Sequence, residues 1–106
     1  MAYINLSELE AREVMPGFMG KFSHGTTMTA SFWEIKKGSV LPRHSHIHEQ
    51  ISIVTAGTFE MTLGEEKKVL EPGMVAMIPS NMEHEGVALT DCTIMDVFCP
   101  VREDYR

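Results

Sequence analysis

The sequence predicts an all-β fold, a sandwich or barrel of about eight to ten short strands. Its β-branched and aromatic residues come in short segments, and turn-forming residues separate these segments roughly every 8 to 12 residues. Only one short segment, near the N-terminus, has a helical pattern. A chain of 106 residues has room for one modest core, so residues 1–106 are expected to form a single domain.

The N-terminal segment carries the helical pattern. Residues 1–6 are compatible with a short edge strand. Ser7-Glu8-Leu9-Glu10 then has the capping-box pattern, with Ser7 as the N-cap and Glu10 at the third helical position. This helix is expected to last a turn or two at most, because Pro16-Gly17 stops it.

The strands are expected between turn signals. Residues 26–36 (TTMTASFWEIK) are rich in β-branched and aromatic side chains, and Lys37-Gly38 ends them as a turn. Pro42 places the next strand at an edge or a bulge, and Glu71-Pro72-Gly73 is a strong turn signal further on. In chain order, the strands are expected at 26–36, 40–46, 50–55, 58–63, 67–70, 74–78, 84–89 and 93–98.

Charge and composition exclude several classes of protein. The 9 Lys and Arg against 15 Asp and Glu give a net charge of -6 without a basic run, which argues against nucleic acid and anionic membranes as partners. The longest apolar run, residues 74–78, is far too short to span a membrane, and the acidic N-terminus lacks a signal-peptide pattern. Cys92 and Cys99 should point to opposite faces of one strand and stay reduced. These features predict a cytoplasmic protein.

A stretch bounded by two glycines (GSVLPRHSHIHEQISIVTAG) carries a candidate metal site. His44 and His46 share one face of a strand, with their positions about 7 Å apart along it. This spacing suits a metal ion bound at about 2 Å from each ligand. Gln50 has the same parity and is expected to be folded back beside them by a hairpin. His84 follows a proline turn at the start of another strand, so three nitrogens and one amide oxygen would complete the site.

Three neighbouring residues offer alternatives. Glu49 is the other possible oxygen ligand, but its parity is wrong on a regular strand. His48 shares the parity of His46, but it falls in the expected bend between strands. It is therefore expected in solvent or behind the ligands, and not as a ligand itself. His24 is expected in a loop. A histidine-rich exposed hairpin without metal is the remaining alternative, and the flanking glycines with the second histidine-bearing turn argue against it.

The last expected strand contains a second group of candidates. Asp96 is a carboxylate in an otherwise apolar segment (TIMDVF), and a buried carboxylate is costly unless it is paired or used. Asp96 and Phe98 share a face, which is either the barrel interior, toward the metal, or the outside. Arg102 follows the strand and suits a bidentate hold on a carboxylate, although spacing alone favours an ordinary surface charge.

Two segments resemble the paired motifs of the cupins. Residues 38–57 fit G-x5-H-x-H-x3-E-x6-G except for Gln50, and residues 73–84 fit the start of G-x5-P-x-G-x2-H-x3-N except for Asn81. Ala88 replaces the final asparagine. The resemblance implies a cupin double-stranded β-helix, a jelly roll of two antiparallel sheets, with a divalent metal inside. A neutral Gln50 leaves the ion its full charge, which favours polarising a substrate oxygen over oxygen chemistry.

The segments HSHIHEQ and DVFCPVRED, with the region before His84, resemble the small single-domain cupins of the KdgF type. These act in bacterial breakdown of pectin and alginate, where they convert 4,5-unsaturated monouronates to linear keto acids with a metal held by three His and one Gln. The family's D-x-F-x-x-x-R segment matches Asp96, Phe98 and Arg102. The resemblance implies catalysis and substrate binding by these residues.

The resemblance therefore implies a metal-dependent enzyme acting on a small unsaturated sugar acid. The ligand spacing does not choose among Mn, Fe, Co, Ni and Zn. A homodimer is expected, both from the resemblance and because so small a barrel has sheet edges to cover. Two alternatives stay open: another metal cupin, a dioxygenase or an isomerase of a small polar substrate, and a non-catalytic cupin that binds a small ligand.

Overall fold

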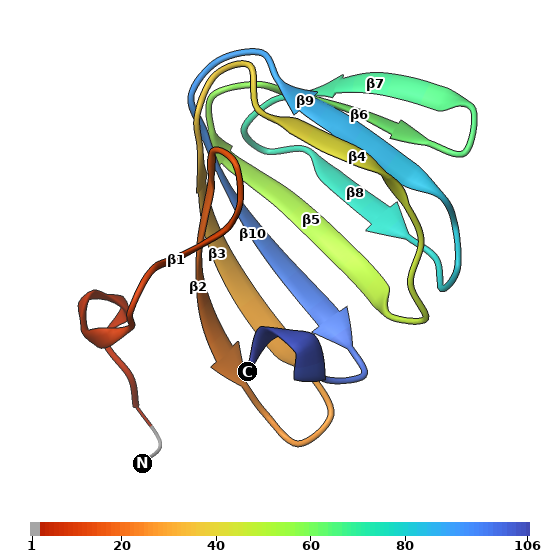
Figure 1. Cartoon of the computed structure of the whole chain (residues 1–106). Coiled ribbons are helices and arrows are strands. Elements are labelled where there is room, and N and C mark those ends of the chain that lie inside the picture. Colours follow the sequence, from red (N-terminus) through yellow and green to blue (C-terminus); the bar gives the residue numbers. More distant parts are fainter. Residues whose placement is uncertain (1–2) are drawn as a thin grey trace.

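The computed structural model describes residues 3–106, which form ten strands and two short 3-10 helices (Figure 1). The elements, in chain order, are η1 (Leu6–Glu8), β1 (Arg12–Met15), β2 (Phe18–His24), β3 (Thr29–Ile35), β4 (Val40–His44), β5 (Glu49–Ala56), β6 (Phe59–Leu63), β7 (Glu66–Leu70), β8 (Val75–Ile78), β9 (His84–Ala88), β10 (Cys92–Cys99) and η2 (Glu103–Tyr105). The predicted all-β fold with a short N-terminal helical turn is confirmed. No helix among the described residues is long and apolar enough to cross a membrane.

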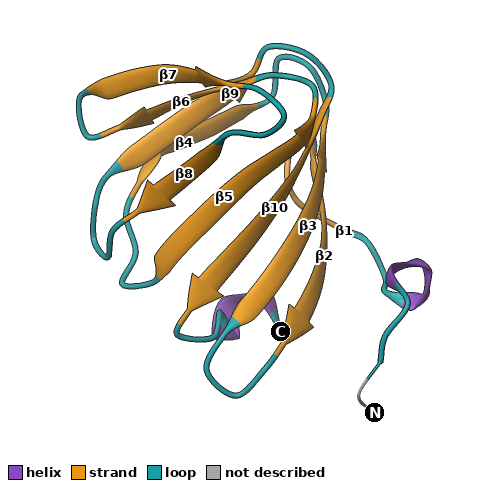
Figure 2. Ribbon diagram, turned by 180° about the vertical axis from the view of Figure 1, so that it is seen from behind, coloured by secondary structure: helices purple, strands orange, loops and turns teal. Residues whose placement is uncertain are grey.

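The strands make two antiparallel sheets that face each other (Figure 2). One sheet has six strands in the order β1-β2-β3-β10-β5-β8, and the other has four in the order β4-β9-β6-β7. Consecutive strands β4 and β5 lie in different sheets, so the chain crosses from one layer to the other between them. The same is true of β5 and β6, of β8 and β9, and of β9 and β10, as in a jelly roll.

Strand periodicity divides the interior into an apolar and a polar part. Along β10 every second side chain is buried or nearly so, because alternate side chains share a face. One inner row pairs Asp96 with Ser31 on β3 and with Ser52 on β5, and the next pairs Phe98 with Gln50. The apolar part is larger and contains Phe18, Trp33, Ile35, Val54, Phe59, Met61, Ile78 and Ile94.

The N-terminal region differs from its prediction. The 3-10 helix is capped by Asn5, whose side chain accepts from the Ser7 amide, so Ser7 is not the N-cap. Residues 3–5 are not a strand, and residues 1–2 of the expected edge strand lie outside the described residues. Pro16-Gly17, with Gly17 at φ +84°, turns β1 into β2. β1 pairs with β2, and β2 pairs with β3, the next strand in the chain. The two strands were missed because their stability comes from this pairing more than from β propensity.

The C-terminal segment packs against the rest of the molecule. After β10 it turns into η2, which folds back over one end of the larger sheet (Figure 1). Arg102, just before this turn, is only 8% exposed. On β10 itself Cys92 is buried and Cys99 exposed, and both are free, as their parity predicted.

Candidate active site

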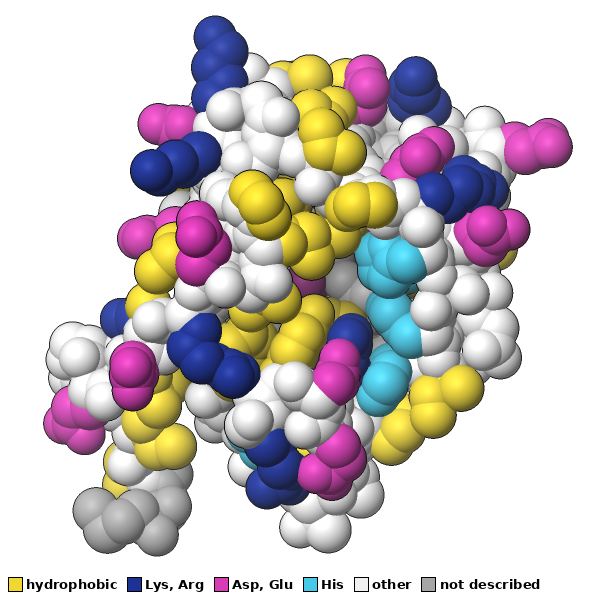
Figure 3. Space-filling model, in the orientation of Figure 1, with side chains coloured by type: hydrophobic (Ala, Val, Ile, Leu, Met, Phe, Trp, Pro, Cys, Tyr) yellow, Lys and Arg dark blue, Asp and Glu magenta, His cyan; other side chains and the backbone are white. Residues whose placement is uncertain are grey.

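Three histidines, from the end of β4, the loop after it and the start of β9, meet at the polar end of the interior. His44 ends β4 and is the register partner of His84, which begins β9, and His46 lies just beyond β4. A nitrogen from each ring can be chosen so that all three lie within 4.8 Å of one another. In the space-filling view, histidine side chains gather along one wall of a hollow, opposite hydrophobic ones (Figure 3).

Local backbone carbonyls set the orientation of each ring. Nδ1 of His44 lies 2.8 Å from the Pro42 carbonyl oxygen, Nδ1 of His46 lies 3.0 Å from that of His48, and Nδ1 of His84 lies 2.9 Å from that of Met82. A carbonyl only accepts, so each Nδ1 must carry its proton and each Nε2 keeps a free lone pair. This is the tautomer of histidines that ligate a metal through Nε2.

The loop that carries His46 is held by the turn before β9. The backbone N–H of Asn81 donates to the His46 carbonyl at 2.7 Å, and the Ser80 hydroxyl donates to the Ile47 carbonyl at 2.6 Å. Asn81 has a φ of +64°, the left-handed conformation that asparagine tolerates better than most residues. The substitution of the motif glycine by Asn81 therefore keeps the turn.

Gln50 reaches the histidines from the other sheet. The expected hairpin is wrong, because β4 and β5 do not pair and Gln50 approaches across the interior. Its Oε1 lies 3.1 Å from Nε2 of His46. With Nδ1 protonated, these are two acceptors facing each other, an unfavourable contact that a cation between them would relieve. The donor set of three neutral imidazoles and one amide oxygen fits a divalent transition metal.

The protonation of the histidines agrees with this donor set. Burial, with the positive charge of Arg102 as the next cause, lowers the pKa of His46 to about 4. Burial likewise lowers the pKa of His84, which is 1% exposed. Both rings are therefore neutral near pH 7, as a metal ligand must be.

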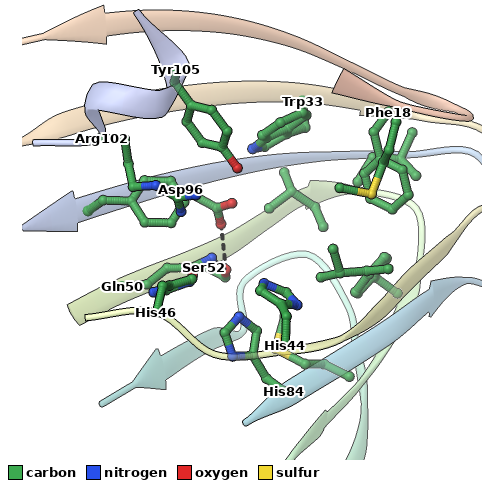
Figure 4. Close-up of a pocket in the computed structure, with 17 residues that line it drawn as sticks. Phe18, Trp33, His44, His46, Gln50, Ser52, His84, Asp96, Arg102 and Tyr105 are labelled. Atoms are coloured by element: carbon green, nitrogen blue, oxygen red, sulfur yellow. Dashed lines mark hydrogen bonds between the residues drawn. The ribbon is translucent and has the colours of Figure 1, made fainter. Parts of the chain in front are cut away.

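Asp96 is connected to Gln50 through Ser52. Gln50 Nε2 donates to the Ser52 hydroxyl at 3.0 Å, and that hydroxyl donates in a short hydrogen bond to Asp96 Oδ1 (Figure 4). Asp96 points into the interior and is 8% exposed. Burial raises its pKa to about 6, although hydrogen bonds from Ser52 and Gln50 act in the opposite direction. A carboxyl with such a pKa exchanges protons readily near neutral pH.

Arg102 closes the same pocket on the far side of Asp96. Its guanidinium carbon lies 4.7 Å from the centre of the Phe98 ring and 4.2 Å from that of Tyr105. Asp104 holds it through Nε at 3.0 Å and Nη2 at 2.7 Å. Arg102 is therefore a fixed, largely buried cation and not an ordinary surface charge.

The remaining candidates lie outside the histidine cluster. Glu49 is exposed, on the opposite face from Gln50. His48 is half-buried at the pocket edge, with its ring 6.3 Å from Phe98, and its Nδ1 has no hydrogen-bond partner within residues 3–106. His24 is not in a loop: it ends β2, where its ring lies 2.9 Å from the Thr29 hydroxyl.

The pocket residues that escaped prediction from the sequence include Trp33, Ser52 and Tyr105. Ser52 was within reach, since it has the parity of Gln50 on an expected strand and a small polar side chain in an apolar run. Trp33 also lay on an expected strand, but nothing local showed which face was interior. Tyr105 gave no signal, because only the fold brings the end of the chain to the pocket.

Comparisons with known proteins agree with this geometry. Residues 31–98 match the family model of the cupin domain. The pectin degradation protein KdgF of Dickeya dadantii (strain 3937) is 38% identical over 71 residues, which make up 65% of this chain and 64% of that protein. The chain thus matches slightly less than two thirds of this relative's length.

Two solved structures superpose along the whole chain. KdgF from Halomonas sp. has a TM-score of 0.94 at 32% identity, covering 100% of this chain and 99% of that one. An RmlC-like cupin from Shewanella frigidimarina NCIMB 400 has a TM-score of 0.95 at 25% identity, covering 100% and 96%. With two facing sheets, paired histidine motifs and these likenesses, the chain belongs to the cupin family, among the small cupins that resemble KdgF.

Proposed function

We propose that this cupin is a metal-dependent enzyme that converts a small 4,5-unsaturated uronate to its linear keto form. The observation that carries the proposal is a single pocket with a proton-exchanging carboxyl, a fixed guanidinium and a neutral metal-ligand set. The likeness to KdgF, which is named for pectin degradation, supports the substrate class. Each group has a separate task in the reaction.

The metal would be held by His44, His46, Gln50 and His84. These side chains bring no negative charge, so a divalent ion keeps its full charge when bound, and Mn, Fe, Co, Ni and Zn all accept such ligands. The ion would supply a positive charge that stabilises negative charge developing on a substrate oxygen.

Asp96 moves the protons in the proposed reaction. The anomeric hydroxyl of the uronate loses its proton to Asp96, and the bond between the anomeric carbon and the ring oxygen breaks. This leaves an aldehyde at C1 and an enolate at C5, with the negative charge on the former ring oxygen. A proton delivered from Asp96 to C4 then gives the C5 ketone, so substrate and product are isomers and no oxidant is consumed.

Arg102 and Phe98 bind the substrate. The guanidinium is the cation of the pocket, and it suits the uronate carboxylate because it can bind both oxygens. Phe98 packs against this guanidinium and lies 5.9 Å from the His46 ring. It therefore spans the distance between the carboxylate-binding group and the metal ligands, where the sugar ring would lie.

The direct test is incubation with 4,5-unsaturated galacturonate, followed by NMR and by loss of the ultraviolet absorbance of the enol ether. Conversion well above the buffer rate is expected, and chelator should remove it. A rate equal to buffer in metal-loaded protein would contradict the proposal. Uptake of O₂ with added Fe(II) would instead indicate a dioxygenase, and binding without conversion a non-catalytic cupin.

The chain is further proposed to form a homodimer through the outer face of its larger sheet. Apolar side chains lie side by side across four strands of this face, in two rows: Met77, Ile51 and Val97, and Val75, Ile53, Met95 and Phe32. Val75 and Met77 are 59% and 46% exposed, so a second copy would remove apolar surface from water. Ile51→Lys should halve the mass measured by light scattering, whereas Val40→Lys, on the other sheet, should not. A wild-type monomer would contradict this.

A cytoplasmic location is proposed as well. The two cysteines are free in the described structure, which fits a reducing compartment. The net charge of -6 fits a protein that keeps away from anionic membranes and nucleic acid.

A further inference from the structure

The last turn of the described chain brings Tyr105 into the pocket. Its ring centre lies 4.7 Å from that of Phe22, 5.9 Å from that of Trp33 and 6.0 Å from that of Phe98. The residue lines the same cavity as Asp96. Tyr105 is thus the one phenol that the pocket contains among the described residues.

The backbone around Tyr105 is fixed by residues from the start of the chain. Its carbonyl accepts from His24 Nε2 at 3.3 Å and, in a short hydrogen bond, from the Arg12 guanidinium. The Thr29 hydroxyl accepts from the Arg102 amide at 2.9 Å and can donate to His24 Nδ1. These hydrogen bonds connect β1, β2 and β3 to the segment that contains η2, so the fold fixes the position of Tyr105.

The ring of Tyr105 is one of two aromatic rings that contact the Arg102 guanidinium. Phe98 covers it at 4.7 Å and Tyr105 at 4.2 Å, and such contacts are favourable for a desolvated cation. Asp104 occupies Nε and Nη2. The Nη1 edge is therefore the part of the guanidinium left for a ligand, and the two rings set its direction.

The hydroxyl of Tyr105 is directed inward. In the close-up it points toward the Asp96 carboxyl, with the Trp33 indole beside it (Figure 4). The indole nitrogen itself donates to Ser31 at 2.8 Å, so it is already engaged. Burial raises the pKa of Tyr105 above its usual value, which keeps the hydroxyl protonated and able to donate.

We propose that Tyr105 is a further substrate-binding residue. Its hydroxyl donates a hydrogen bond to an oxygen of the bound sugar acid beside Asp96, while its ring, together with that of Phe98, holds Arg102 ready for the carboxylate. This inference rests on the proposed function of the pocket. It extends the substrate-binding group from the last strand into the turn that follows it.

The two parts of the inference can be separated by two variants. Tyr105→Phe removes only the hydroxyl, so kcat/KM for unsaturated galacturonate should fall about tenfold, the effect of one lost hydrogen bond. Tyr105→Leu also removes the ring from Arg102, so KM should rise further. Tyr3→Phe is the matched control, because Tyr3 is the other tyrosine of the chain and is 89% exposed.

Binding can be followed without turnover through the single tryptophan. Trp33 lines the pocket, so its fluorescence should respond to galacturonate, a saturated acid that cannot react. Tyr105→Phe should weaken the binding of galacturonate about tenfold while leaving the metal content and the circular dichroism spectrum unchanged. Wild-type protein that neither converts nor binds these acids would overturn the proposed function and this inference with it. A functional wild type matched by Tyr105→Phe in both assays would overturn this inference alone.

Discussion

The two halves of the pocket are built in different ways. In the histidine half, which comprises His44, His46, Gln50 and His84, each ring is oriented by a carbonyl two residues away in the chain. The acid half comprises Asp96, Phe98, Arg102 and Tyr105. Apart from the contact of Arg102 with Asp104, its hydrogen bonds join residues 44, 73, 81 and 93 positions apart.

The difference predicts that metal binding at the proposed ligands and the proposed substrate chemistry can be disrupted separately. Local carbonyls keep the imidazoles in a ligating orientation even when a distant contact is lost. The acid half depends on strands from the whole chain meeting in register. A single substitution should therefore damage one half and spare the other.

The largest expected effect is on turnover, from Asp96→Asn. The amide cannot carry protons between substrate atoms, so kcat should fall about a thousandfold, within the usual range for general acid–base groups. Metal content, measured by plasma mass spectrometry after saturation with metal, should equal that of the wild type, because Asp96 is not among the proposed ligands and its charge affects only their affinity for the ion. Undiminished activity would show that Asp96 has no part in the mechanism. Loss of the metal would show that the histidine half depends on the acid half.

The reverse separation is expected from His84→Ala. Loss of one imidazole should weaken metal binding about a hundredfold or more, and turnover should fall with it. Galacturonate binding, followed by Trp33 fluorescence, should survive through Arg102. His48→Ala is the matched control and should keep its metal, since His48 lies outside the cluster. Equal metal loss in both variants would contradict the proposed ligand set.

The pH dependence of stability tests the burial of Asp96. Its pKa is raised to about 6, so the folded protein binds the proton more tightly than the unfolded chain does. The stabilisation from protonation is complete below the usual carboxyl pKa and is lost as pH rises toward 6, at a cost of about 3 kcal/mol. Metal-free Asp96→Asn should therefore gain stability over wild type from pH 4 to 7 in urea unfolding. If the free energies of unfolding of the two proteins changed with pH in parallel, the Asp96 carboxyl would not be desolvated.

The smallest expected effect is from Asp104→Asn. This change weakens the two-pronged contact with Arg102, so KM for the uronate should rise about threefold to tenfold while kcat changes little. Glu103→Gln is the control, since within residues 3–106 the ion pair of Glu103 is with exposed Arg106. A change confined to kcat would mean that Asp104 acts on the chemical step and not on the position of the guanidinium.

The same contrast explains what could be predicted from sequence. Strand parity and turn residues act over a few positions, so His44, His46, Gln50 and His84 could be named together as proposed ligands, although the hairpin expected to bring Gln50 beside the histidines is wrong. The inward direction of Asp96 could be stated only as one of two choices, because the face of a strand is decided by its partners. The strand at residues 18–24 depends on pairing with the strands before and after it, and the position of Tyr105 depends on packing across the chain. Local propensity carries little signal for either.

Gln50 gives the connection between the halves a direction. Its amide has an acceptor end, which faces His46, and a donor end, which faces Ser52 and through it Asp96. A glutamate there would have no donor for Ser52 and would set a second negative charge near Asp96. With the amide, a cation at one end and a negative charge at the other favour each other. By thermodynamic reciprocity, protonating Asp96 must then weaken metal binding by the same factor by which the metal lowers its proton affinity.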